Sequence, residues 1–544
     1  MTRPGWASAE RVLLLGGTIY SPVSPFATAM LVEGDTIAWL GEDSAGDTHR
    51  DAVDRVIDLR GRLVTPGFVD AHVHATSTGL TLTGLDLTGT ASLREALDLL
   101  EARARSLRGG VILGHGWDET RWPEGRGPTR QEIDRATWGS VVYLSRVDVH
   151  SAAVSSALAA MVPGLAALPG YDAEGPLSRE AHHAVREAAL DSVTPGQRDA
   201  AQAVMRARCA ELGIVAMHEM AGPTISGEDD LSALLATSER EPGPLVTGYW
   251  GELAERGGID RARALGAYGV AGDLFVDGAI GSRTACLCEP YADAPSTSGA
   301  AYLDAAAVAA HVVAATSAGL QAGFHVIGDA ASEAVIAGFE AAAAELGEAS
   351  VRALGHRLEH AELLTDAHIA TMARLGIVAS MQPMFDGLWG GEGGMYAQRL
   401  GAARAARMNR FADLVAAGVV TAFGSDAPVT SLGPWEAVTA AVHHTVPGQR
   451  LSTRAAFSAH TRAGWRAVGE QSSGVLAPGA AAHFAVWSVD EVVVQAPDDR
   501  LSAWSTDPRS GTPGLPALGP GAALPACERT VVAGRTVFDT GMLD

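Results

Sequence analysis

The sequence contains no lysine, and all 40 of its basic side chains are arginine. These are outnumbered by 63 aspartates and glutamates, which gives a formal charge of −23. A chain this acidic is not expected to bind nucleic acid or an anionic membrane surface. Cysteine is scarce as well: the four residues are too few and too scattered for a disulfide framework (Cys209, Cys286, Cys288 and Cys527).

Long apolar runs are also missing near the start of the chain. The first twenty residues hold only the short run Val12 to Leu15, which is too short for the core of a signal peptide or for a membrane span. We therefore expect a cytoplasmic protein. At 544 residues, with 47% hydrophobic and 19% charged side chains, the composition indicates a globular protein of two or three domains.

The two ends of the chain share a β-rich composition. Short β-branched and apolar stretches broken by Gly, Asp and Pro occupy residues 10–64, and similar ones lie at 483–487 and 530–538. Neither end is large enough to bury a core alone, so residues 1–65 and 471–544 are predicted to form one small composite β-sandwich. The Pro/Gly/Ser-rich stretch 491–527 is predicted to be a long loop.

The middle of the chain, residues 66–470, alternates short apolar strands with alanine-rich helices. This alternation favours an α/β fold with a parallel sheet, and at this length a (β/α)₈ TIM barrel. Nine or ten stretches qualify for the eight strand positions, because 111–115 and 245–249 both read as strands. The span from about 80 to 205 is too long for one strand–helix unit, so an inserted subdomain is expected there.

Histidines and one aspartate stand where predicted strands end. His72 and His74 are two apart, so on a strand both imidazoles project from the same face and could clamp a divalent cation. His325, His360 and Asp426 each close a later apolar strand. Carboxyl ends of barrel strands meet at one face, and histidine with aspartate is the donor mixture of hydrolytic zinc sites.

The ordered set of segments resembles the amidohydrolase superfamily, and within it amidohydrolase family 3. The resemblance runs through almost the whole chain in the segments 65–74, 116–119, 128–130, 146–150, 274–279, 325–329, 356–360, 379–383 and 424–428. It implies a metal-dependent hydrolase with one or two divalent ions, most simply Zn²⁺. It also implies that Asp426 both binds metal and acts as the general base. His360, or failing it His325, would hold a second metal or the carbonyl oxygen.

One position departs from the family. Where these enzymes carry a lysine that bridges two metals as its carbamate, this chain has Asp273, and it has no lysine to substitute. Three arrangements remain open: a pair of metals bridged by Asp273, a single metal on His72, His74, His325 and Asp426, or a weakened site. Asp273 could also be a plain surface turn residue.

Several further side chains are candidates for binding the substrate: Trp117, Arg146, His150, His218 and Gln382. Asp329 and Glu359 are predicted to orient histidine ligands. The expected reaction is hydrolysis of a C–N bond, of amide, N-acyl or N-formyl type, in a small molecule. The alternatives are a single-metal, deaminase-like hydrolase and a catalytically silent barrel used as a scaffold. The quaternary structure stays open, and a homodimer is the assembly that the resemblance suggests.

Overall fold

The computed structural model describes residues 4–107, 109–146, 151–223, 225–495, 504–505, 513–519 and 521–543. The chain forms two compact units, one made of Met1–His74 with Arg206–Asp544 and the other of Ala75–Met205. None of the helices in this described part combines the length and the apolar run that spanning a bilayer requires.

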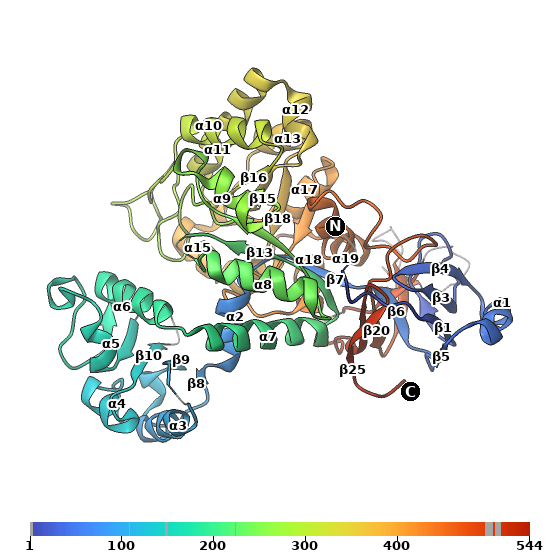
Figure 1. The fold of residues 1–544 in the computed structure, drawn as a ribbon. Helices are drawn as coiled ribbons and strands as arrows, with labels where there is room; N and C mark the ends of the chain where they lie inside the picture. Colours follow the sequence, from blue (N-terminus) through green and yellow to red (C-terminus); the bar gives the residue numbers. More distant parts are fainter. Residues whose placement is uncertain are drawn as a thin grey trace. The chain divides into compact units, whose positions relative to one another are not determined.

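The larger unit contains an eight-stranded parallel barrel, and this confirms the predicted TIM-barrel fold (Figure 1). Its strands, in spatial order, are β7 (Phe68–Val73), β13 (Ile214–Ala221), β14 (Leu245–Trp250), β15 (Gly269–Val270), β16 (Gln321–Val326), β17 (Arg357–His360), β18 (Val378–Met381) and β19 (Thr421–Phe423).

The barrel closes between its first and last strands. Val73 forms a parallel bridge with Ala427, and the Ala427 carbonyl accepts the His74 N–H at 3.0 Å. The Asp426 N–H donates to the His72 carbonyl at 2.8 Å. The candidate stretch at 245–249 is a barrel strand, whereas the one at 111–115 belongs to the other unit, which resolves the surplus of strand candidates.

Helices cover the outside of the barrel because each has one apolar stripe. In α11 (Asp329–Leu346) the buried residues Ala331, Val335, Phe339 and Ala342 recur every three or four positions, as expected for a helix packed on a sheet. The other covering helices are α8 (Glu228–Arg240), α9 (Gly258–Leu265), α10 (Ala305–Ser317), α13 (Asp366–Leu375), α17 (Phe411–Ala416) and α20 (Arg462–Ala467).

The ends of the chain form the predicted composite β-sandwich. One sheet contains β1 (Arg11–Leu15), β3 (Ala29–Glu33), β4 (Thr36–Gly41) and β5 (Arg55–Asp58). The other joins both ends of the chain in β2 (Thr18–Ile19), β6 (Leu63–Pro66), β20 (Phe484–Ser488), β24 (Ala526–Val532) and β25 (Arg535–Asp539). The antiparallel pairing of β6 with β20 ties the two ends together, and residues from both, such as Leu14 and Phe484, share one apolar core.

The prediction that residues 491–527 form a long loop is wrong in part. It contains strands β21 (Val492–Gln495), β22 (Trp504–Ser505) and β23 (Leu515–Pro516), which form a small three-stranded sheet. The run Val492 to Val494 has the β-branched character of a strand, but the surrounding Pro and Gly obscured it.

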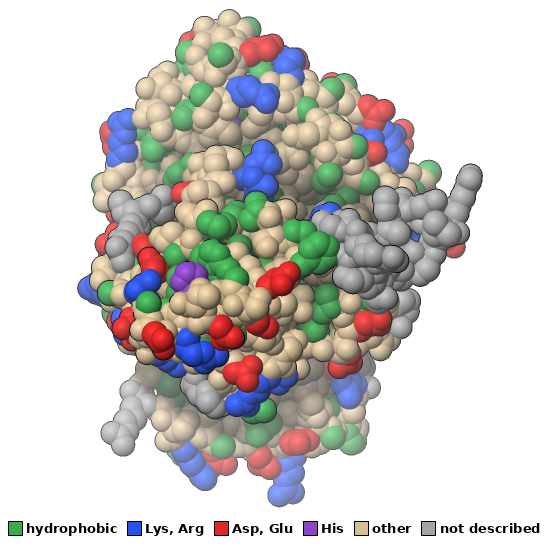
Figure 2. Space-filling model, turned by 90° about the vertical axis from the view of Figure 1, so that its right-hand side faces the viewer, with side chains coloured by type: hydrophobic (Ala, Val, Ile, Leu, Met, Phe, Trp, Pro, Cys, Tyr) green, Lys and Arg blue, Asp and Glu red, His purple; other side chains and the backbone are tan. Residues whose placement is uncertain are grey.

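Figure 2 shows arginine and carboxylate side chains interspersed over one face of the molecule, with hydrophobic side chains near its middle.

The smaller unit has a core of its own. Its sheet runs in the order β12 (Leu177–Ser178), β11 (Ser151–Val154), β10 (Val141–Arg146), β9 (Val111–Trp117) and β8 (Leu85–Asp86). Helices α3 (Leu93–Ser106) and α4 (Arg130–Thr137) supply one apolar cluster, and α6 (Arg179–Asp191) supplies another.

Candidate metal centre

The six residues predicted to bind metal lie at or just after the carboxyl ends of barrel strands. His72 and His74 come from the end of β7, His325 from β16 and His360 from β17. Asp273 follows β15 and Asp426 follows β19. Because these strands are parallel neighbours in a closed barrel, side chains more than 350 positions apart along the chain meet at one face.

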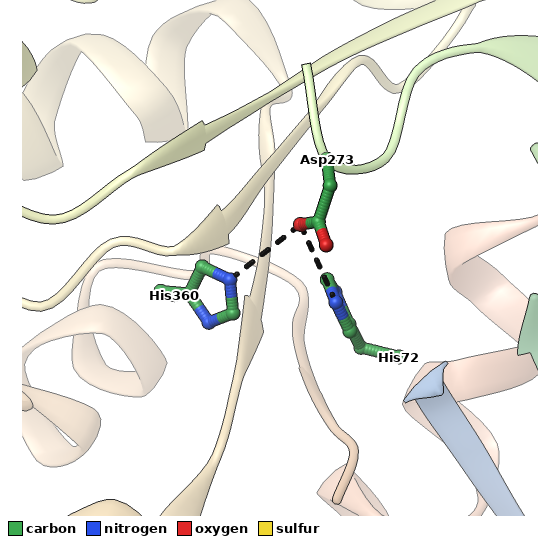
Figure 3. Close-up of side chains that lie close together, drawn as sticks. All are labelled: His72, Asp273 and His360. Atoms are coloured by element: carbon green, nitrogen blue, oxygen red, sulfur yellow. Dashed lines mark ion pairs between the residues drawn. The ribbon is translucent and has the colours of Figure 1, made fainter. Parts of the chain in front are cut away.

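The Asp273 carboxylate lies at the centre of the cluster. Its Oδ1 is 3.5 Å from His72 Nε2, 3.6 Å from His325 Nδ1 and 3.8 Å from His360 Nε2. Its Oδ2 is 3.1 Å from His74 Nε2. Figure 3 shows His72 and His360 turned toward this carboxylate from different strands. With 8% of its side chain exposed, Asp273 is not the surface turn residue considered above.

Each imidazole has its remaining ring nitrogen bonded to an acceptor of the protein. His72 Nδ1 donates to Glu359 Oε2 at 2.8 Å, and His74 Nδ1 donates to the Met220 carbonyl at 3.1 Å. His325 Nε2 faces the Gly278 carbonyl at 3.3 Å, and His360 Nδ1 donates to Gln382 Oε1 at 2.8 Å. In the neutral ring these bonds fix the tautomer, so the lone pair of the other nitrogen points into the cluster, where it can bind a cation in place of a proton.

Asp426 completes the cluster on the side of β7. Its Oδ1 lies 3.4 Å from His72 Nε2 and 3.3 Å from His74 Nε2. Asp426 and His360 both have left-handed backbone, with φ of 55° and 69°. Such conformations are costly for residues other than glycine and concentrate at functional sites. The buried Asp70 accepts the Ser425 N–H at 2.9 Å and so holds the loop that carries Asp426.

The electrostatics follow from this packing of acids against imidazoles. Burial lowers the pKa of His74, but its bonds to Asp273 and Asp426 outweigh burial and raise the pKa to about 10. The same carboxylates raise the pKa of His72 well above its ordinary value, against its burial. Burial raises the pKa of Asp273, yet the surrounding imidazoles outweigh burial and hold the pKa well below its usual range. Positive charge is therefore strongly favoured at this point.

The donor set fits a divalent cation. Among the described residues, buried His72 Nε2, His325 Nδ1 and Asp273 Oδ1 have no partner at hydrogen-bonding geometry, although all three point into the cluster. Two groups have ligand atoms within 4.8 Å of one another: His72, His74 and Asp426, and His72, Asp273 and His360. Imidazole and carboxylate are the ligands that zinc and similar ions take.

A buried ion pair supports the cluster through His72. Arg357 binds Glu359 through two bonds, of 2.5 Å and 2.9 Å, and donates to the Ala71 carbonyl at 2.7 Å. Burial raises the pKa of Glu359, but the Arg357 charge and the His72 bond outweigh it and lower the pKa to about 2. Glu359 thus orients His72, as expected. Arg357 was missed in the sequence, although Arg357 and Glu359 alternate on one strand and could have been read as a pair.

Other predicted residues have different surroundings. Gln382, expected to bind substrate, uses its carbonyl oxygen on His360, while its buried Nε2 has no partner among the described residues. His218 is buried against Arg357, with Nδ1 and Nη1 3.2 Å apart, and burial lowers its pKa well below the ordinary value. Within the described part of the chain, Asp329 bonds to no histidine, and its carboxylate accepts the N–H groups of Cys288 and Ala330 instead.

Two of the substrate-binding candidates, Trp117 and Arg146, belong to the smaller unit. Trp117 is buried in its core and donates its indole N–H to the Leu144 carbonyl at 2.8 Å. Arg146 pairs with Glu119 at 2.9 Å and with Asp118 at 3.5 Å. His150 lies outside the described residues. Substrate binding by these residues stays a prediction.

Comparison with known proteins agrees with the cluster. A profile of the amidohydrolase family matches residues 55–538. The protein LONG AFTER FAR-RED 3 of Arabidopsis thaliana is 28% identical over 532 residues, covering 90% of this chain and 89% of that protein. The N-substituted formamide deformylase of Arthrobacter pascens is 26% identical over 462 residues, covering 80% of this chain and 83% of that enzyme.

A solved structure has the same fold. An uncharacterized metal-dependent hydrolase from Pyrococcus furiosus superposes with a TM-score of 0.74 at 26% identity, covering 88% of this chain and 98% of that one. The family profile covers most of the sequence, and the histidine and aspartate cluster lies at the face where barrel enzymes place their active sites. The chain therefore belongs to the amidohydrolase family of metal-dependent hydrolases.

Proposed function

We propose that the protein hydrolyses a C–N bond of amide, N-acyl or N-formyl type in a small molecule, with a divalent cation, most simply Zn²⁺, as its cofactor. The observation that carries this proposal is the orientation of four imidazoles, each tied back by one nitrogen and turned toward Asp273 by the other. The family membership and the formamide-cleaving relative support the bond type.

When bound, the cation lowers the pKa of water from 15.7 toward about 7 and polarises the substrate carbonyl. Asp426 is the proposed general base, since its carboxylate lies at the edge of the cluster with Oδ1 beside His72 and His74. It takes a proton from the attacking water as the carbon–oxygen bond forms. It then delivers that proton to the leaving nitrogen as the C–N bond breaks, so that acid and amine products balance.

We further propose that the centre holds two cations bridged by Asp273. His72 Nε2 has one lone pair and can bind one ion, so His72, His74 and Asp426 would hold one ion. His325 and His360, whose ring nitrogens lie 3.6 Å and 3.8 Å from Asp273 Oδ1, would hold the other. Asp273 Oδ2 faces His74, and Oδ1 faces His72, His325 and His360, so the carboxylate lies between the two sets of ligands. This carboxylate would replace the bridging lysine that the sequence lacks.

The test is metal content with activity, on protein purified without chelator or metal-affinity resin. We expect two equivalents of metal per chain, and hydrolysis of N-formyl or N-acetyl amines that chelation abolishes and Zn²⁺ or Mn²⁺ restores. Asp273→Ala should lose at least one equivalent, whereas the surface control Asp293→Asn should keep both. One equivalent with activity would refute the bridge but not the hydrolase, and no metal uptake would refute both.

A further inference from the structure

An aromatic ring stands directly beside the proposed metal ligands. Phe275 lies two residues after Asp273 and forms a parallel bridge with His325. Hydrogen bonds fix this register, with the Val276 N–H on the His325 carbonyl at 3.0 Å and the His325 N–H on the Leu274 carbonyl at 3.1 Å. Bridge partners point their side chains to the same side. The Phe275 ring accordingly lies against the His325 imidazole, with ring centroids 4.6 Å apart.

The ring is open to solvent although the ligand beneath it is buried. Phe275 is 38% exposed and His325 only 7%. An isolated exposed apolar residue needs no explanation, but a group of them at a reactive centre does. The exposed face of Phe275 is therefore available to a ligand that approaches the metal centre.

Two further exposed side chains belong to residues whose backbone is hydrogen-bonded to the ligand-bearing segments. Tyr302 is 55% exposed, and its N–H donates to the Val276 carbonyl at 2.7 Å, which fixes it beside the Phe275 segment. Val429 is 53% exposed, and its N–H donates to the Asp426 carbonyl at 2.8 Å. Each is thus fixed by the backbone to a segment that supplies a proposed metal ligand or the general base.

We infer that Phe275, with Tyr302 and Val429, forms an apolar wall for the substrate group next to the scissile bond. The substrate class that fits is an amide with an aromatic ring attached close to its reacting carbonyl or nitrogen. A flat ring can stack on Phe275 while the carbonyl reaches the ligand cluster, and aromatic pairs gain from such contact beyond the area they bury. This inference rests on the proposed function.

Hydroxamates test the inference without turnover, because they chelate active-site metals. Calorimetry on the metal-loaded protein would compare acetohydroxamate with benzohydroxamate and N-phenylacetohydroxamate, which carry a ring on the carbonyl or the nitrogen side. We expect at least one aryl compound to bind about tenfold more tightly than acetohydroxamate, a difference of about 1.4 kcal/mol. Equal binding of all three would overturn the apolar wall alone. Failure of all three to bind would overturn the proposed metal centre as well.

Substitutions at Phe275 test whether its ring causes the preference for aryl hydroxamates. Phe275→Ala should reduce the aryl preference to less than about threefold with unchanged metal content, and Phe275→Leu, which keeps an apolar side chain, should restore only part of it. Phe26→Ala is the matched control, because Phe26 is 50% exposed in the segment between β2 and β3 of the sandwich. An aryl preference that survives in both Phe275 variants, or that falls equally in Phe26→Ala, would contradict the assignment to Phe275.

Discussion

Two sets of histidines in the larger unit are almost equally buried, yet they bond in opposite ways. In the proposed ligand set, one ring nitrogen is bound to the protein and the other faces carboxylates. In the second set, which we call the core histidines (His356, His460 and His483), a ring nitrogen forms a hydrogen bond with a backbone group. His356 Nδ1 accepts the Ala322 N–H at 2.8 Å while Nε2 binds Thr316, and His483 Nδ1 accepts the Ala533 N–H at 3.1 Å.

The charge preference differs in the same sense. Burial lowers the pKa of each core histidine to about 4, whereas carboxylates raise the pKa of His72, His74 and His325 in spite of burial. Burial alone therefore does not mark a ligand histidine. The neighbouring acids do, because they create a place where positive charge is stabilised. Four experiments test this difference between the two sets of histidines.

The largest effect is expected at Asp426, the acid that faces His72 and His74. Asp426→Asn removes the proposed base and should lower kcat by about 10³-fold or more, since general bases contribute 10²–10⁴-fold and this residue is also a ligand. Circular dichroism should show an intact fold. Asp366→Asn, at a carboxylate with 91% of its side chain exposed, is the control. Near-normal turnover in Asp426→Asn would refute the assigned role.

The same substitution in each set of histidines should have opposite consequences. His72→Leu should lower metal affinity by more than about 100-fold, because a ligand is lost. His356→Leu should leave metal content unchanged but lower the free energy of unfolding by about 1–3 kcal/mol, because the buried Ala322 N–H loses its acceptor. Elemental analysis and urea unfolding would measure both. Equal metal loss in the two variants would show that the ligand set and the core histidines do not differ in metal binding.

A smaller effect is expected from the acid that orients His72. Glu359→Gln should weaken metal affinity by about 10- to 100-fold, the usual result of losing a partner that orients a ligand. Competition with a chromogenic chelator would measure the change. Glu340→Gln, half exposed on α11, should have no effect on affinity. An unchanged affinity in Glu359→Gln would show that the Arg357–Glu359 pair serves the fold alone.

The smallest effect concerns pH and the core histidines. Their folded-state pKa of about 4 lies below the ordinary 6.5, so the unfolded chain binds more protons between these values. Their contribution to stability is complete above pH 6.5 and is lost as pH falls toward 4, by roughly 1–3 kcal/mol per residue at most. Urea unfolding at pH 7 and pH 5 should show this loss, and His483→Gln should reduce it. If the free energy of unfolding of His483→Gln fell as much between pH 7 and pH 5 as that of the unchanged protein, the loss could not be attributed to His483.

Local patterns were sufficient to predict much of the fold. The alternation of strands and helices predicted the barrel, and the β-rich stretches at 10–64 and 530–538 predicted the shared sandwich, because each signal depends on periodicity within a few residues. The stretch at 111–115 was ambiguous for the same reason. It reads as a strand wherever it lies, and only contacts distant in sequence assign it to the smaller unit.

Residue type and order were enough to identify which residues could bind a cation. His72 and His74 alternate on a strand, and His325, His360 and Asp426 each end one, so the chemistry of the site follows from residue type and order. The position of Asp273 and the tautomer of each histidine could be assigned only from the tertiary structure. Asp273 reaches four imidazoles, and Glu359, Met220, Gly278 and Gln382 fix the ring nitrogens. These contacts join strand ends far apart in the chain, and a distance of 3–4 Å between them is set by barrel closure, which no local pattern encodes.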